Sequence, residues 1–253
     1  MKLRPLTSAL ALAAMLALPV GASSAVAGTD AASAVDPAAI DAAKRMGAYL
    51  RTLNDFQVVS QAQLEEVLDN GKKVFTSVST TAKVHRPDGF TIDMTTDHKA
   101  RRFYYDGKSF TVFAPKVGYY ASVSAPATID DTVQVINDNY GIVLPLADVF
   151  YWGTDQEPFD NMDKAVHVGA ETVDGVATDH YAYAGGGIAW DVWIEQGATP
   201  LPVKMVITTM GDSDRPTYSS DLSWSTQVAF APGTFTFSPS ADAKPIAMAS
   251  VEQ

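Results

Sequence analysis

Histidines next to carboxylates are the residues of this sequence that could do acid–base chemistry, and their spacing does not favour it. The four histidines are His85, His98, His167 and His180, and no H-E-x-x-H or G-x-S-x-G motif occurs. His180 follows Asp179 in a strand pattern, where neighbouring side chains point to opposite faces. A hydrolase that uses this Asp–His pair is kept as an alternative. The sequence itself predicts no enzyme and no catalytic residue.

Adjacent carboxylates occur twice, and each pair has a structural explanation. Glu65 and Glu66 lie in a strand pattern, so their side chains diverge. Asp130 and Asp131 fall in the first turn of a predicted helix, where the helix dipole favours negative charge. The acidic stretch 155–163 has Pro and Phe where a calcium loop needs ligands, and the chain contains no cysteine. The sequence therefore predicts no metal site and no cofactor.

The first 27 residues have the three parts of a secretory signal peptide. Lys2 and Arg4 give a positive start, an apolar run follows from 6 to 20, and Ala25-Val26-Ala27 is a small-residue cleavage pattern. The apolar run is shorter than the ~20 residues that a spanning helix needs. We therefore predict cleavage near Ala27, a periplasmic location and no transmembrane segment.

The acidic charge of the chain excludes one class of partner. There are 18 Lys and Arg against 29 Asp and Glu, a net charge of −11. Nucleic acid recognition needs a basic patch, and docking on anionic lipid through bulk charge needs positive charge as well. No nucleic acid partner is expected, and the excess of acids fits a soluble surface.

The apolar pattern after residue 35 predicts a helix followed by an antiparallel sheet. Asp36 as N-cap and Pro37 at the first helical position begin a helix from 37 to about 53. After it the apolar period changes to two, and turn signals separate short strands. The middle of the chain predicts helices over 128–140 and 144–152, and strands then resume until a last one at 235–237.

These elements define the predicted fold class and domain organisation. The class is α+β, with one large curved antiparallel sheet and a helical insert. The predicted parts are a signal peptide at 1–27, a flexible leader at 28–35, a single domain at 36–246 with the insert at about 128–152, and a loose C-terminal tail at 247–253.

Alternation places one set of apolar side chains on the concave side of the predicted sheet. A packed core explains such a set by itself, whereas an unfilled part of it would form an apolar pocket. The residues that we expect to line this apolar cavity are Ile40, Leu50, Val58, Val78, Ile92, Met94, Phe110 and Val112.

Three stretches resemble a known fold. Residues 103–115, which contain Asp106-Gly107-Lys108, look like a hairpin of the LolA/LolB-type periplasmic lipoprotein-carrier fold, as do 193–195 with 202–204 and the ending 230–239. The mature chain from Asp36 to about Ile246 also resembles a family of predicted periplasmic proteins of unknown function.

The resemblance implies a half-barrel wrapped around the N-terminal helix and closed by a helical lid. In the carriers the enclosed cavity takes acyl chains. We therefore expect a periplasmic, non-enzymatic binding protein that holds a lipid, an acyl chain or a lipidated protein in an apolar half-barrel cavity. The alternative is a sensory or protein-interaction module with the same fold and an unknown protein partner.

Overall fold

The computed structural model describes residues 34–68, 70–157 and 162–251. The predicted signal peptide and most of the predicted leader lie outside the described residues. Within the described ranges, no helix combines the length and the apolar character needed to cross a membrane.

Helix α1, Pro37–Thr52, begins where the sequence predicts it. The Asp36 side chain accepts a hydrogen bond from the Ala38 amide at 2.9 Å, and Pro37 needs no amide partner in the first turn. Its apolar face buries Ala39, Met46 and Leu50, among others, against the sheet. The predicted N-terminal helix is confirmed.

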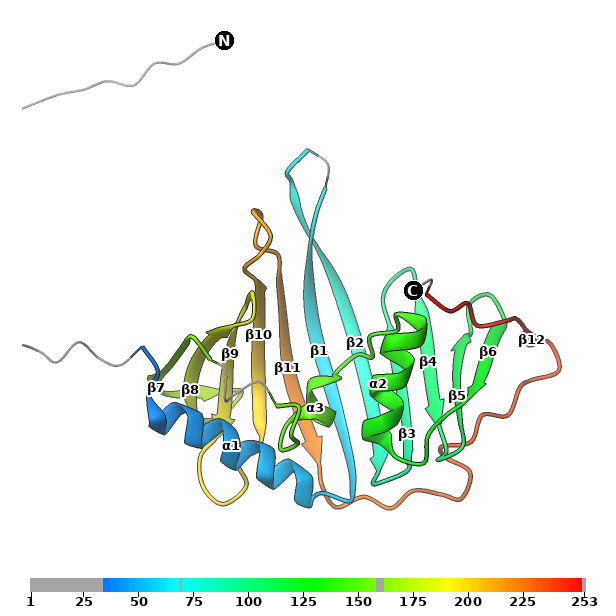
Figure 1. Ribbon diagram of the computed structural model, residues 1–253, viewed down its shortest axis with the longest axis horizontal. Coiled ribbons are helices and arrows are strands. Elements are labelled where there is room, and N and C mark those ends of the chain that lie inside the picture. The colour runs from blue at the N-terminus through cyan, green and yellow to red at the C-terminus, as the bar shows by residue number, and fades with distance from the viewer. Residues whose placement is uncertain (1–33, 69, 158–161, 252–253) are drawn as a thin grey trace, which may run out of the picture. The chain divides into compact units, whose positions relative to one another are not determined.

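One antiparallel sheet provides the frame of the domain (Figure 1). Its strands are β1 (Asp55–Val67), β2 (Lys73–His85), β3 (Gly89–Thr95), β4 (Ala100–Tyr105), β5 (Ser109–Ala114), β6 (Tyr119–Ser124), β7 (Lys164–Val173), β8 (Val176–Gly185), β9 (Ile188–Glu195), β10 (Pro202–Thr209), β11 (Thr217–Ser225) and β12 (Lys244–Pro245). The 12 strands follow the order β12-β6-β5-β4-β3-β2-β1-β11-β10-β9-β8-β7, and only β12 runs parallel to its neighbour. The predicted large, curved antiparallel sheet is confirmed.

The helices of the described residues pack against one side of this sheet, which we call the inner face (Figure 1). Opposed residues of paired strands share a face, so the pairs Val58–Ala82, Ala82–Ile92 and Ile92–Phe103 form one row across four strands. Helix α1 is fixed to this face by a hydrogen bond from the Tyr183 hydroxyl to the Ala39 carbonyl, at 2.8 Å.

The helical insert follows the prediction in its first half. Helix α2, Ile129–Tyr140, is capped by the Thr128 hydroxyl and ends at Gly141, whose φ of 62° is left-handed. Helix α3 covers only Asp148–Tyr151, so the predicted helix over 144–152 is wrong in its first turn. Leu146 has a φ of 61°, which interrupts a right-handed helix at that point.

The C-terminal segment crosses the outer face instead of forming the predicted strand at 235–237. Two consecutive turns occupy this region, with hydrogen bonds from Thr234 to Ala231 and from Thr236 to Gly233. Phe237 packs at centroid distances of 5.2, 5.4 and 5.0 Å against aromatic rings of three neighbouring strands, namely those of Tyr104, Phe113 and Tyr120. The ring of Phe237 therefore holds the C-terminal segment against the outer face of the sheet. Further on, the Val251 amide donates to the Asn139 carbonyl at 2.9 Å.

Candidate functional site

The structure places the eight predicted cavity residues around the inner face in two groups. The first group is buried in the core and consists of Leu50, Val58, Ile92 and Phe110. The second group is partly exposed and consists of Ile40, Val78, Met94 and Val112. The same side of the sheet therefore carries both a packed region and an open one.

The covered end is the part of the inner face under the helices, and we define it by Phe56, Phe90, Tyr105, Phe110 and Phe150. All five side chains are buried. The Phe90 ring lies at centroid distances of 5.3, 6.3 and 5.6 Å from the rings of Tyr105, Phe110 and Phe150. Aromatic rings at these distances pack against one another, so the protein's own side chains fill this end.

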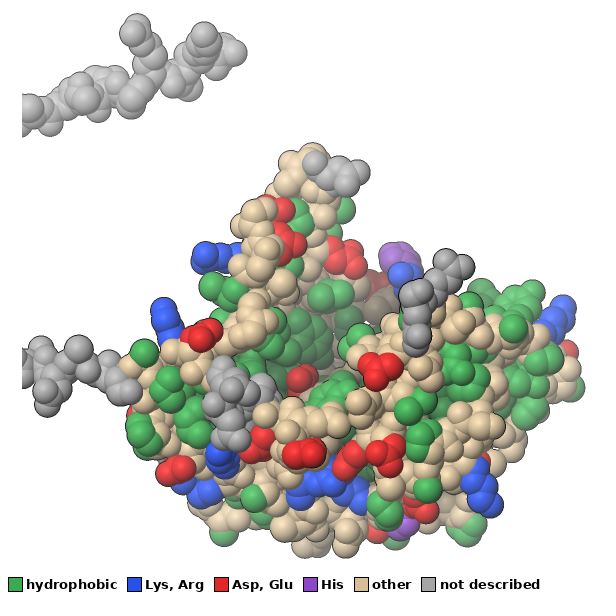
Figure 2. All heavy atoms as spheres, in the orientation of Figure 1, with side chains coloured by type: hydrophobic (Ala, Val, Ile, Leu, Met, Phe, Trp, Pro, Cys, Tyr) green, Lys and Arg blue, Asp and Glu red, His purple; other side chains and the backbone are tan. Residues whose placement is uncertain are grey.

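The open end is the opposite part of the inner face, and we define it by Leu64, Val78, Met94, Ile207 and Tyr218. All five are partly or largely exposed, and Leu64 reaches 36%. Figure 2 shows a hollow with hydrophobic side chains beside the β1–β2 hairpin and above α3. The described structure thus leaves apolar side chains accessible on a recessed surface.

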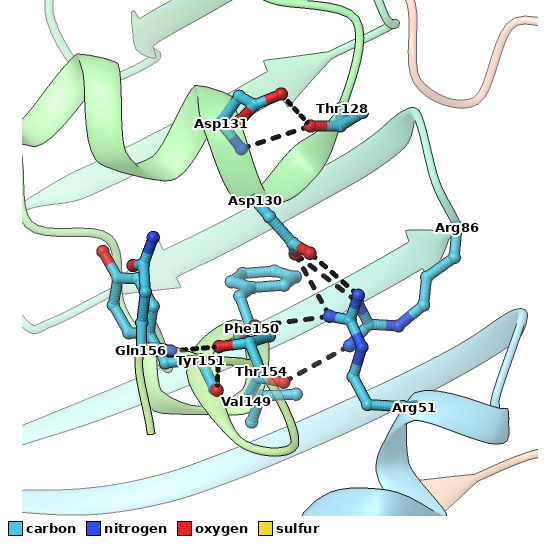
Figure 3. A network of polar contacts seen from close by, with 10 residues as sticks. All are labelled: Arg51, Arg86, Thr128, Asp130, Asp131, Val149, Phe150, Tyr151, Thr154 and Gln156. Atoms are coloured by element: carbon cyan, nitrogen blue, oxygen red, sulfur yellow. Dashed lines mark hydrogen bonds and ion pairs between the residues drawn. The ribbon is translucent and has the colours of Figure 1, made fainter. Parts of the chain in front are cut away.

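A polar network fixes the helices over the covered end (Figure 3). Arg51 donates to both oxygens of Asp130, at 3.2 and 2.8 Å, and Arg86 Nη1 lies 3.8 Å from the same carboxylate. Arg86 also donates to the Val149 carbonyl at 3.3 Å, and Arg51 to the Phe150 carbonyl at 3.5 Å. The network joins the end of α1, the β2–β3 turn, the start of α2 and the end of α3.

The chemistry of this network favours an anchoring role. The Arg86 side chain is only 7% exposed. Burial lowers the pKa of Arg86 to about 10, the positive charge of Arg51 acts in the same direction, and Asp130 opposes the shift. An adjoining cavity of about 450 Å³ is lined by more carboxylates than guanidinium groups, namely Asp130, Asp131 and Asp155 against Arg51 and Arg86. That balance does not favour an anionic ligand.

The predicted alternative of an Asp179–His180 pair is not brought together. The His180 ring nitrogens lie 3.0 Å from Glu171 and 2.9 Å from Asp191, on the outer face. Asp179 lies on the inner face and contacts His167 at 3.2 Å. Across the described residues, no group of three or more His, Asp or Glu side chains is placed to hold a metal ion.

Sequence reasoning missed the Arg51–Asp130–Arg86 network. It treated Asp130 only as a charge at the start of a helix, whereas 79 residues separate Asp130 from Arg51 in the chain. No short motif links residues at such a separation. An arginine directly before Pro87, in a turn between two apolar strands, was the only local signal.

Comparison with known proteins gives one family and several structures of similar fold. Residues 39–249 match the family described as "Predicted periplasmic protein (DUF2092)". No curated protein matches the sequence.

The structural matches share little sequence with this chain. An uncharacterised conserved protein from Thermus thermophilus is 8% identical with a TM-score of 0.49, over 83% of this chain and 99% of that one. LprF from Mycobacterium bovis is 16% identical with a TM-score of 0.42, over 77% and 96% of the two chains. A LolA superfamily protein from Nitrosomonas europaea is 10% identical with a TM-score of 0.35, over 79% and 97%.

Proposed function

Since the chain belongs to the DUF2092 family of predicted periplasmic proteins, we propose that it is a periplasmic, non-enzymatic binding protein that holds the acyl chain of a lipid or lipidated protein. The site is the open end of the inner face. The observation that carries the proposal is the accessible apolar surface of Leu64, Val78, Met94, Ile207 and Tyr218 on the inner face. Figure 2 shows a hollow with hydrophobic side chains beside the β1–β2 hairpin.

The free energy of burying hydrocarbon supports such a site. Each CH₂ group removed from water contributes ~0.8 kcal/mol, so an apolar surface can hold an acyl chain without any reacting group. The covered end cannot serve, because buried aromatic rings already fill it. The ligand would therefore lie along the open end and leave the core unchanged.

The proposed site overlaps in part with the cavity that the sequence predicts. None of the five cavities described for this chain, of about 450, 210, 330, 460 and 160 Å³, is lined by any of the eight predicted residues. The proposal therefore concerns an open trough, and of the predicted residues Val78 and Met94 belong to it.

Native mass spectrometry of protein purified from the periplasm tests the proposal. We expect mass additions that correspond to a lipid, and saturable binding of a fluorescent fatty acid after delipidation. Protein that carries no lipid and also fails to bind the fluorescent fatty acid would rule out this function.

One observation favours the alternative of a protein-interaction module. The β1–β2 ladder continues to the pair Val67–Lys73, whereas the pairing of β1 with β11 ends at Leu64. The hairpin tip therefore projects beyond the sheet, with Phe75 66% exposed (Figure 1). A photo-crosslinker at position 75 would capture one specific protein in the periplasm if this alternative holds, and only lipid or no adduct if it does not.

A further inference from the structure

The inner face carries one basic side chain that the proposed function does not yet use. Within strands β1–β11, the register places Arg101 on the inner face, directly opposite Met94 of the open end. Every other Lys or Arg of these strands lies at a position that faces outward. Among the Lys and Arg residues of these strands, Arg101 is therefore the one that adjoins the apolar trough.

The contacts of Arg101 leave its charge uncompensated. Its Nη1 atom donates to the carbonyl of Ala100, the preceding residue, at 2.9 Å. Among the described residues it forms no ion pair, although it is partly buried. A partly buried charge without an opposite charge is unfavourable, and an anionic ligand would relieve this cost.

The adjacent arginine shows what an ordinary structural pairing looks like in this strand. Arg102 points to the outer face, where its Nε atom lies 2.7 Å from Asp93. Arg101 and Arg102 share strand, residue type and local sequence, and differ in face and in partner. Arg102 thus forms an ion pair on the outer face, whereas Arg101 is a cation next to the proposed ligand site.

We propose that Arg101 binds the anionic group of the ligand, so that the protein prefers acyl chains that carry a carboxylate or phosphate over neutral ones. The inference rests on the proposed function, because it requires an acyl chain in the open end. Guanidinium groups bind carboxylate and phosphate oxygens through paired N–H donors, and such charge-assisted bonds are stronger than neutral ones. The hydrocarbon would then extend from Met94 toward Val78 and Leu64.

Two ligands that have the same hydrocarbon chain and differ only in the head group test this preference. Dodecanoate and dodecanol are titrated into the delipidated protein at pH 8, where the acid is ionised. We expect the wild-type protein to bind dodecanoate about tenfold more tightly than dodecanol or better, which corresponds to one charge-assisted hydrogen bond. Arg101→Gln should lower the affinity for dodecanoate to that for dodecanol, and leave dodecanol binding unchanged.

Two further variants serve as controls. Arg102→Gln removes the outward-facing arginine and should keep the full preference for dodecanoate. Arg101→Lys keeps the positive charge but not the paired N–H donors, so it should keep part of the preference. Unchanged dodecanol binding by Arg101→Gln excludes a general loss of folding as the cause. A preference that survives Arg101→Gln would overturn the inference while the proposed function stands. Failure of the wild-type protein to bind either ligand would overturn both.

Discussion

The covered end and the open end of the inner face are built by the same alternation on strands of one sheet, and they differ in whether helices lie over them. At the covered end, Phe90 and Phe110 pack under the helices and are fully buried. At the open end, Val78 and Leu64 continue the face on β1 and β2 without full cover. An apolar strand face thus becomes a packed core where helices cover it and stays an accessible apolar surface where they do not.

Truncation of a covered-end ring should give the largest effect on stability. Phe110→Ala removes a buried ring that contacts Phe90 and Phe103, each at a centroid distance of 6.3 Å. We expect a loss of about 3–5 kcal/mol in the free energy of unfolding, measured by denaturant titration. Fatty acid affinity of the folded variant should stay unchanged. A large change in fatty acid affinity would contradict the claim that the covered end is core only and takes no part in binding.

Loss of the carboxylate that anchors the helices should have a smaller effect. Asp130→Asn removes the charge shared by Arg51 and Arg86 and leaves Arg86 buried beside a neutral group. Because Asp130 is 38% exposed, solvent screens part of the interaction. We expect a loss of about 1–2 kcal/mol in unfolding free energy. The matched control is Asp138→Asn on the exposed side of α2, which should cost no stability; equal losses in the two variants would remove the anchoring role.

Truncation at the open end should affect binding more than stability. Met94 is partly exposed, so Met94→Ala should lower the unfolding free energy by no more than about 1 kcal/mol. It should also weaken binding of a fluorescent fatty acid severalfold, because the methionine side chain would contact the hydrocarbon. A stability loss as large as that of Phe110→Ala would place Met94 in the core instead.

Substitution of Glu65, at the base of the projecting hairpin, should have a small, pH-dependent effect on the stability of the fold. Burial raises the pKa of Glu65, but hydrogen bonds from Lys73 and Thr217 outweigh it and hold the pKa below its ordinary value. A carboxylate with a lowered pKa stabilises the fold above its ordinary pKa of about 4.3, and this contribution is lost as the pH falls.

Melting temperatures at pH 7 and pH 3.5 check this expectation. Glu65→Gln should lower the melting temperature at pH 7 and have less effect at pH 3.5. The exposed neighbour Glu66 provides the control, since Glu66→Gln should change little at either pH. An effect of Glu65→Gln that is independent of pH would contradict the assignment.

The sequence predicts the frame of this fold because its signals are local. The cap formed by Asp36 and Pro37, the left-handed end at Gly141 and the period-two strands all depend on residues close in the chain. Alternation also assigns Val78 and Phe110 to one face. It cannot distinguish them, because the difference depends on where α2 and α3 pack.

The features that sequence reasoning missed depend on distant partners or on a single dihedral angle. Leu146 adopts a left-handed φ that no residue preference predicts, and this shortens α3. Phe237 alternates with Phe235 as in a strand, yet the rings that it contacts come from three strands far back in the chain. Tertiary packing overrides the local pattern at both places.

Two matched valine substitutions test the central claim most directly. Val78 lies at the open end, and Val166 is 48% exposed on the outward-facing side of β7. Binding of a fluorescent fatty acid is measured for Val78→Asp and Val166→Asp, after circular dichroism shows that both are folded. We predict that a charge at Val78 weakens binding by about tenfold or more, whereas a charge at Val166 leaves it unchanged. Equal affinity of the two folded variants would contradict an acyl-chain site at the open end.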